Sequence, residues 1–156
     1  MKIAIDSDGN GSDLKKRILA HIKELGHEVE DLAYLRDNDG EEYPDVAYNL
    51  AKKIRDKEFE RGILICGTGL GMAIMANKIP GVYAGACNDV YAAERLQKSN
   101  NAQVLTLGSK VVGEESAKLI SEAFVQSGFQ GGRSLPKFVR IQEIENEIMH
   151  DKHYDQ

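Results

Sequence analysis

Short apolar runs alternate along the chain with longer segments in which apolar residues recur every three or four positions. The short runs are typical of buried β-strands and predict five of them, over residues 2–6, 27–32, 62–65, 82–87 and 104–107. The helical spacing predicts six α-helices, over residues 14–25, 43–57, 72–78, 90–98, 113–127 and 139–149. Strands that alternate with helices in this way favour a parallel sheet covered by helices on both faces.

The pattern therefore predicts an α/β fold: a three-layer α/β/α sandwich around a doubly wound, mostly parallel five-stranded sheet of Rossmann-like type. A chain of 156 residues is long enough to bury a core and fits one domain. We expect that domain to span residues 1–149, including the last helix, and to be followed by a polar tail over residues 150–156.

Composition and charge argue against several classes of partner. The formal net charge is −5, and no basic cluster suggests binding to nucleic acid or to an anionic membrane. No stretch approaches the roughly 18 apolar residues that span a bilayer, and the apolar run at the N-terminus is too short for a signal peptide. The two cysteines, Cys66 and Cys87, have neither metal-site nor redox-pair spacing. We therefore expect a cytoplasmic protein.

The turn after the third predicted strand is the best candidate for chemistry. Cys66 ends the apolar run there, and Gly67, Thr68, Gly69 and Gly71 follow before the next helix. Ligands of open α/β sheets bind beyond the carboxyl ends of strands, where glycines let backbone N–H groups approach an anion. The positive end of a helix also stabilises a thiolate beside it. Cys66 could thus remove a proton and the turn could stabilise the resulting oxyanion; the alternative is an inert, buried cysteine in a tight turn.

Other polar residues are weaker candidates. Asp6 and Asp8 close the first strand and could act as acid, base or hydroxyl ligand, or could simply be solvated or capping carboxylates. Arg133, in the glycine-rich stretch 128–133, could grip a phosphate, with Lys137 and Arg140 as weaker candidates for the same role. Cys87 is expected in the core. A metal site is disfavoured, because the histidines lie in predicted helices, at a strand start and in the tail.

Five segments together resemble one known family, namely Leu64–Gly71, Ala76–Gly81, Leu107–Gly113, Gly131–Arg133 and Tyr43–Asp45. Over residues 1–145 the chain is similar to the ribose-5-phosphate isomerase B and galactose-6-phosphate isomerase family. The resemblance implies a homodimer, or a tetramer built from dimers, with active sites shared between subunits. It also implies aldose–ketose isomerisation of a phosphorylated sugar through a cis-enediolate, without a metal or any other cofactor.

The same resemblance implies roles for particular residues. Cys66 would move a proton between C1 and C2, and Thr68 would assist at the hydroxyl proton. The backbone of Gly67, Gly69 and Gly71 would bind the enediolate, and the side chains of Asp8, Ser99 and Asn100 would bind the sugar. Tyr43 would line the pocket. Arg133, from the other subunit, would bind the phosphate together with Lys137.

Two departures from the family pattern bear on the substrate. The ribose enzymes of the family carry Asp-His where this chain has Asp8-Gly9, and His-Asn where it has Ser99-Asn100. The second histidine is the group that opens the furanose ring. A tetrose 4-phosphate cannot close a furanose, because its O4 is esterified, and so needs no such group. Residues 99–103 also resemble the branch that interconverts erythrulose 4-phosphate and erythrose 4-phosphate, which is the substrate pair we expect.

Four alternatives remain open from the sequence. The chain could be a ribose-5-phosphate isomerase whose ring opening is spontaneous or uses another residue, or a galactose-6-phosphate isomerase subunit that needs a partner chain. A nucleotide-binding module without catalysis is disfavoured by the glycine spacing and by its place on the third strand. A redox protein is disfavoured because Cys66 has no nearby resolving cysteine.

Overall fold

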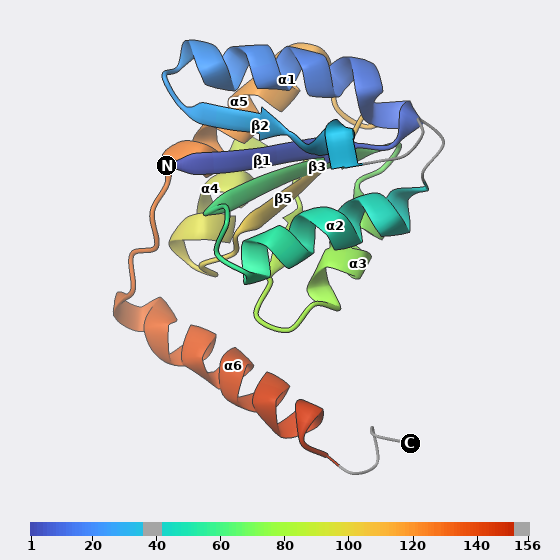
Figure 1. Ribbon diagram of the computed structural model, residues 1–156. Helices are drawn as coiled ribbons and strands as arrows, with labels where there is room; N and C mark the ends of the chain where they lie inside the picture. Colours follow the sequence, from blue (N-terminus) through green and yellow to red (C-terminus); the bar gives the residue numbers. More distant parts are fainter. Residues whose placement is uncertain (36–41, 152–156) are drawn as a thin grey trace.

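The protein is described by a computed structural model that covers residues 1–35 and 42–151. A five-stranded sheet forms its centre, and all four strand pairings are parallel (Figure 1). The sheet order is β2-β1-β3-β5-β4, made of β1 (Lys2–Ser7), β2 (Glu28–Asp31), β3 (Arg61–Cys66), β4 (Ala84–Ala86) and β5 (Val104–Gly108). The predicted α/β fold with five strands is confirmed.

Helices cover both faces of this sheet. On one face lie α1 (Ser12–Glu24), α4 (Val90–Lys98) and α5 (Glu114–Gln126), and on the other α2 (Tyr43–Arg55) and α3 (Leu70–Asn77). Short 3-10 turns, η1 (Gly9–Gly11), η2 (Leu32–Leu35) and η3 (Gly132–Ser134), join some of these elements. The last helix, α6 (Leu135–Met149), runs apart from the sheet (Figure 1).

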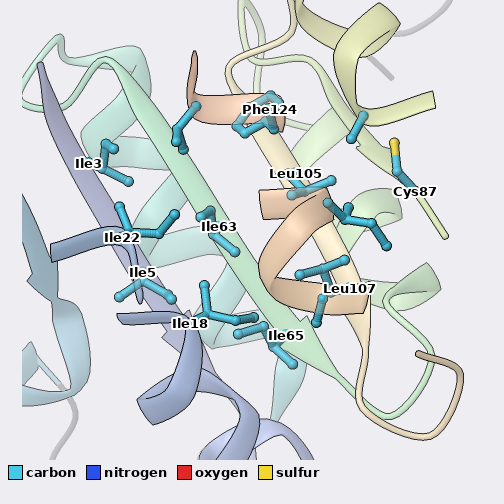
Figure 2. Close-up of a cluster of buried hydrophobic side chains, with 14 of the residues drawn as sticks. Ile3, Ile5, Ile18, Ile22, Ile63, Ile65, Cys87, Leu105, Leu107 and Phe124 are labelled. Carbon is cyan, nitrogen blue, oxygen red and sulfur yellow. The ribbon is translucent and has the colours of Figure 1, made fainter. Parts of the chain in front are cut away.

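Alternation along the strands divides the core into two clusters. Ile63 and Ile65 of β3 pack with α1 and α5, as Figure 2 shows, whereas Leu64 and Cys66 pack with α2 and α3. Successive side chains of a strand point to opposite faces, so a strand buried on both sides needs a continuous apolar run. The same rule directs the Cys66 side chain toward α2 and α3.

Most elements differ from the sequence prediction by one or two residues at an end, and the differences in α6, β4 and α3 have a local cause. Helix α6 begins at Leu135 rather than 139, because Pro136 fits the first turn of a helix, where no backbone N–H is needed. Strand β4 is shorter than predicted, since the N–H of Val82 bonds to the carbonyl of Ile79 in a turn. Helix α3 begins at Leu70 rather than 72, directly after the left-handed Gly69.

Helix α6 is attached to the domain by a few side chains. The Phe138 ring lies 5.7 Å from that of Tyr83 and 5.5 Å from that of Phe129, centre to centre. The Glu145 carboxylate accepts hydrogen bonds from the Tyr83 hydroxyl and from the backbone N–H of Gly81. No residue of α6 is buried, and its exposed apolar side chains are Leu135, Val139, Ile141, Ile144, Ile148 and Met149.

Two further predictions concern the chain end and membranes. Of the predicted polar tail, residues 152–156 lie outside the described residues. Within residues 1–35 and 42–151, none of the helices has both the length and the apolar character that a membrane span requires.

Candidate active site

Cys66 ends the central strand β3, and its environment comes from the turn that follows. The side chain is 5% exposed, and its Sγ accepts a hydrogen bond of 3.0 Å from the backbone N–H of Gly69. Leu70 is the first residue of α3, so both the sulfur and this N–H lie at the positive end of a helix. A thiolate at this position gains a hydrogen bond and a favourable dipole.

Gly69 allows this turn to form. Its φ is +80°, a left-handed conformation that costs little for glycine alone. A Cβ atom at this position would also lie 2.9 Å from the carbonyl carbon of Leu107, in the neighbouring strand β5. The Thr106 hydroxyl donates a 2.7 Å hydrogen bond to the Gly69 carbonyl, which fixes the turn against β5. The backbone path of the turn is therefore set by β5 as well as by its own glycines.

Two other predicted residues, Thr68 in this turn and Tyr43 in α2, lie close to Cys66. Thr68 is exposed, and its Oγ1 accepts a 3.2 Å hydrogen bond from the backbone N–H of Leu70. Tyr43, the first residue of α2, packs its ring directly on Gly71, since a Cβ at Gly71 would overlap that ring. The structure thus brings Tyr43 and Thr68 to the same end of α3 as Cys66.

Asp8 follows β1 at the same edge of the sheet. Its backbone N–H donates to the carbonyl of Ile65 (3.2 Å), one residue before Cys66. Its Oδ1 accepts from the N–H of Gly11 at 3.1 Å, so the carboxylate caps the short turn η1. Asp6 is different: its side chain is buried and pairs with Lys15 of α1 at 3.4 Å. Of the two candidates, Asp8 is the one near Cys66.

The loop after β5 closes over the glycine turn. The N–H of Ser109 donates to the carbonyl of Cys66 at 2.8 Å, and that of Lys110 to the carbonyl of Gly67 at 3.0 Å. The aliphatic part of the Lys110 side chain lies against Gly67. Lys110 thereby brings a positive charge to the turn. It lies just beyond the carboxyl end of a strand, a signal that could have identified it from the sequence.

A second group of predicted residues lines a pocket of about 550 Å³. Ser99, Asn100, Arg133 and Lys137 belong to it, together with Arg95, which the sequence did not single out. The loop before η3 reaches this place because the N–H of Gln130 donates to the carbonyl of Lys98 at the end of α4 (3.1 Å). The signal for Arg95 was its spacing: it lies one helical turn before Ser99, to which it is hydrogen-bonded.

These two groups lie at opposite edges of the sheet. Cys66 pairs with Gly108 at the carboxyl edge, whereas Gly62 pairs with Val104 at the amino edge, and Asn100 precedes Val104. The two edges of β3 are separated by about 13 Å, four residues at the rise of a parallel strand. We call Asp8, Tyr43, Cys66, Thr68 and the glycines 67, 69 and 71 the cysteine half-site. The residues Arg95, Ser99, Asn100, Arg133 and Lys137 form the cationic half-site.

Comparison with known proteins assigns the chain to a family. The family model described as Ribose/Galactose Isomerase matches residues 3–141. The chain belongs to the ribose/galactose isomerase family. The predicted family and the predicted class of enzyme, a sugar isomerase, are therefore confirmed.

Individual members are similar to this isomerase over nearly their whole length. It is 45% identical to D-erythrulose-4-phosphate isomerase of Pectobacterium atrosepticum, over 96% of this chain and 99% of the relative. It is 41% identical to ribose-5-P isomerase B of Listeria innocua, over 93% of this chain and 97% of the relative. The solved structure of Clostridium thermocellum ribose-5-phosphate isomerase B matches with a TM-score of 0.88 at 40% identity, covering 94% of this chain and 99% of that one.

Proposed function

We propose that this isomerase interconverts D-erythrulose 4-phosphate and D-erythrose 4-phosphate, with its own side chains as the acid–base groups and its backbone N–H groups as the oxyanion donors. The observation that carries the proposal is the Cys66 sulfur, which accepts the N–H of Gly69 at the start of α3. A base at this place, next to backbone donors, suits the removal of a weakly acidic proton beside a carbonyl. The 45% identity to a relative named for this substrate supports the choice of sugar.

The reaction needs one base and one set of oxyanion donors. The Cys66 thiolate takes a proton from C1 of the ketose, the electron pair forms the C1–C2 double bond, and the C2 oxygen becomes negative. Backbone N–H groups of the turn, those of Gly67 and Gly71, stabilise that charge, while the N–H of Gly69 stays on the sulfur. The thiol then returns the proton to C2, while the proton on O1 passes to O2 with the help of Thr68. C1 becomes the aldehyde carbon, and C2 carries the new hydroxyl group.

The hydrogen bonding of Ser99 supports a substrate that is already open. Its Oγ accepts a 2.8 Å hydrogen bond from Nε of Arg95. A hydroxyl that is bound to a permanently charged guanidinium is a poor proton acceptor, so we assign no ring-opening base to position 99. A tetrose 4-phosphate has no furanose ring to open. Ser99 and Asn100 then bind substrate oxygens, and Arg133 and Lys137 bind the phosphate.

A second copy of the chain completes the site in this proposal. The cysteine half-site supplies the base and the cationic half-site supplies the phosphate ligands, yet they lie at opposite edges of one sheet. The exposed apolar side chains of α3, Leu70 and Ile74, and of α6 provide surface for a second copy to cover. We propose a homodimer, or a tetramer of two such dimers, in which each site combines the half-sites of two chains.

The reduced state of the two cysteines supports a cytoplasmic location. Cys66 and Cys87 are both free thiols. A base that must alternate between thiolate and thiol works where thiols are kept reduced.

Ribose 5-phosphate is the second candidate substrate. The TM-score of 0.88 to a ribose-5-phosphate isomerase B favours it, because the backbone around the site is shared. The absence of a histidine at position 99 disfavours it, since its ring would have to open without that group.

An isomerase assay on both sugar phosphates tests the proposal. We expect the wild type to have a higher kcat/KM for D-erythrulose 4-phosphate than for ribose 5-phosphate. Cys66→Ala should lower kcat by at least about a hundredfold, the usual contribution of a positioned base. Cys87→Ala is the matched control and should keep kcat, because Cys87 lies in the core on the other face of the sheet. Full activity of Cys66→Ala would overturn the mechanism, and a preference for ribose 5-phosphate would overturn the substrate.

A further inference from the structure

Arg95 is a third cation of the cationic half-site, and two hydrogen bonds hold it in place. It lies in the last turn of α4, where Nε donates to Oγ of Ser99 at 2.8 Å and Nη2 donates to Oε1 of Gln130 at 3.4 Å. The two acceptors come from different segments, the turn before β5 and the loop before η3. The guanidinium is therefore held between these two segments rather than free in solvent.

The charge of the pocket suits a dianion. Among the nine described residues that line it, Arg95, Arg133 and Lys137 are cationic and none is acidic. In a chain with a net charge of −5, a pocket with three cations and no carboxylate is a local exception. Neither bond to Arg95 has a charged partner, so its charge is not neutralised by the contacts that position it. Arg side chains held in this way bind phosphate oxygens through two donors at once.

The position of Arg95 relative to Asn100 connects it to the length of the sugar. Ser99, which holds the Nε atom, is covalently joined to Asn100, the proposed ligand of the sugar oxygens. Arg133 and Lys137 instead belong to η3 and α6, on the other wall. A phosphate bound by Arg95 is thus drawn toward the wall that binds the sugar. A four-carbon substrate brings its phosphate one carbon closer to the reacting C1 and C2 atoms than a five-carbon one.

We propose that Arg95, fixed by Ser99, is a third phosphate ligand that selects the four-carbon over the five-carbon sugar phosphate. This inference rests on the proposed function and names a residue that sets its substrate. In this arrangement, Ser99 positions Arg95 instead of opening a sugar ring. Its hydroxyl accepts the N–H of the guanidinium, and its small side chain leaves room for Arg95 to line the pocket.

Kinetics of Arg95→Gln on both substrates test the selection. We expect KM for D-erythrulose 4-phosphate to rise by about tenfold or more, as for loss of a charged hydrogen bond, with kcat largely kept. The KM for ribose 5-phosphate should change by less than about twofold. Arg95→Lys keeps the charge but lacks the Nε donor to Ser99, so it should fall between Arg95→Gln and the wild type, as should Ser99→Ala. Arg55→Gln, an exposed arginine at the end of α2 that pairs with Asp56, is the matched control.

Inorganic phosphate gives a readout that does not depend on the reaction. Phosphate should raise the thermal midpoint of the wild type and of Arg55→Gln, and should raise that of Arg95→Gln much less, because a ligand stabilises in proportion to its binding. An unchanged phosphate effect in Arg95→Gln would overturn its role as a ligand. Equal losses with both sugars would overturn its role in selection. If the wild type isomerises neither sugar, the proposed function fails, while the phosphate result still decides whether Arg95 binds the anion.

Discussion

Cys66 and Cys87 are each 5% exposed, yet their surroundings differ in what they allow the sulfur to do. The sulfur of Cys66 accepts a backbone N–H at the start of α3. Cys87 packs in the cluster between the sheet, α1 and α5, and burial, together with the charge of Asp89, raises the pKa of its thiol to about 11. Cys87 therefore stays protonated at neutral pH. The prediction that it is a core residue is confirmed.

Two glycines of the turn after Cys66 differ in how much an added methyl group would destabilise the fold. Gly69→Ala places a Cβ at a φ of +80° and 2.9 Å from the Leu107 backbone. We expect it to destabilise the fold by about 1–3 kcal/mol through backbone strain and to lower activity, because the N–H that bonds to Cys66 must move. Gly67→Ala is the control, since its Cβ would meet only the flexible Lys110 side chain at 3.7 Å. Thermal unfolding and kcat of both variants measure the difference; equal stability would contradict the role of Gly69.

At the scale of elements, a buried lysine joins α1 to the edge of the sheet. The Nζ of Lys15 lies 3.4 Å from Oδ1 of Asp6 in β1 and 3.1 Å from Oδ1 of Asp31 in β2. Lys15 and Asp6 are both nearly inaccessible to solvent. The sequence left Asp6 open as a candidate for chemistry. In the structure, Asp6 pairs with Lys15 and so stabilises the fold. The carboxylate of Asp8 instead caps η1, beyond the carboxyl end of β1.

Removing this lysine should destabilise the domain without changing the site directly. Lys15→Met removes the buried ammonium group that pairs with both Asp6 and Asp31, which we expect to lower the free energy of unfolding by about 3–5 kcal/mol. Lys16→Met, the exposed neighbour on the same helix, should lower it far less. Urea unfolding at one fixed protein concentration compares the three proteins. A loss no larger than that of Lys16→Met would show that the ion pair is not needed for stability.

At the scale of the whole molecule, the predicted site residues fall into two half-sites that one chain does not bring together. Residues 99–100 are close in sequence to β5, whose other end borders the cysteine turn. The direction of β5 nevertheless carries them to the opposite edge. If two copies share each site, mutations in different half-sites should complement each other.

Co-expression of Cys66→Ala with Arg133→Ala tests this sharing. Each variant alone should be inactive or strongly impaired. In randomly mixed dimers, half the molecules carry both variants, and one of their two sites has an intact cysteine half-site and an intact cationic half-site. We therefore expect recovery of about a quarter of wild-type activity. Co-expressed Cys66→Ala and Thr68→Ala, which alter the same half-site, should recover none. No recovery in the first mixture would overturn the shared site.

The sequence by itself determined the layers of the fold and singled out the turn after Cys66 as the candidate for chemistry. Strand and helix periods are local properties, so residues 62–65 and the glycines after Cys66 could be recognised without a structure. Helix ends do not follow from period alone: the spacing of apolar residues in α6 begins at Val139, but Pro136 allows the helix to start at Leu135. A boundary depends on capping and proline chemistry as well as on period.

Tertiary structure alone decided which residues meet. The order β2-β1-β3-β5-β4 makes β1 and β5 the two neighbours of β3, which brings Asp8 and Lys110 to the cysteine turn. The same order and strand direction put Ser99 and Arg133 at the opposite edge. Arg95 lies there too, hydrogen-bonded to Ser99, a contact that no sequence motif predicted. Which strands are neighbours in a parallel sheet depends on crossover connections between strands that lie far apart in the chain. Sequence spacing does not encode which strand ends lie side by side.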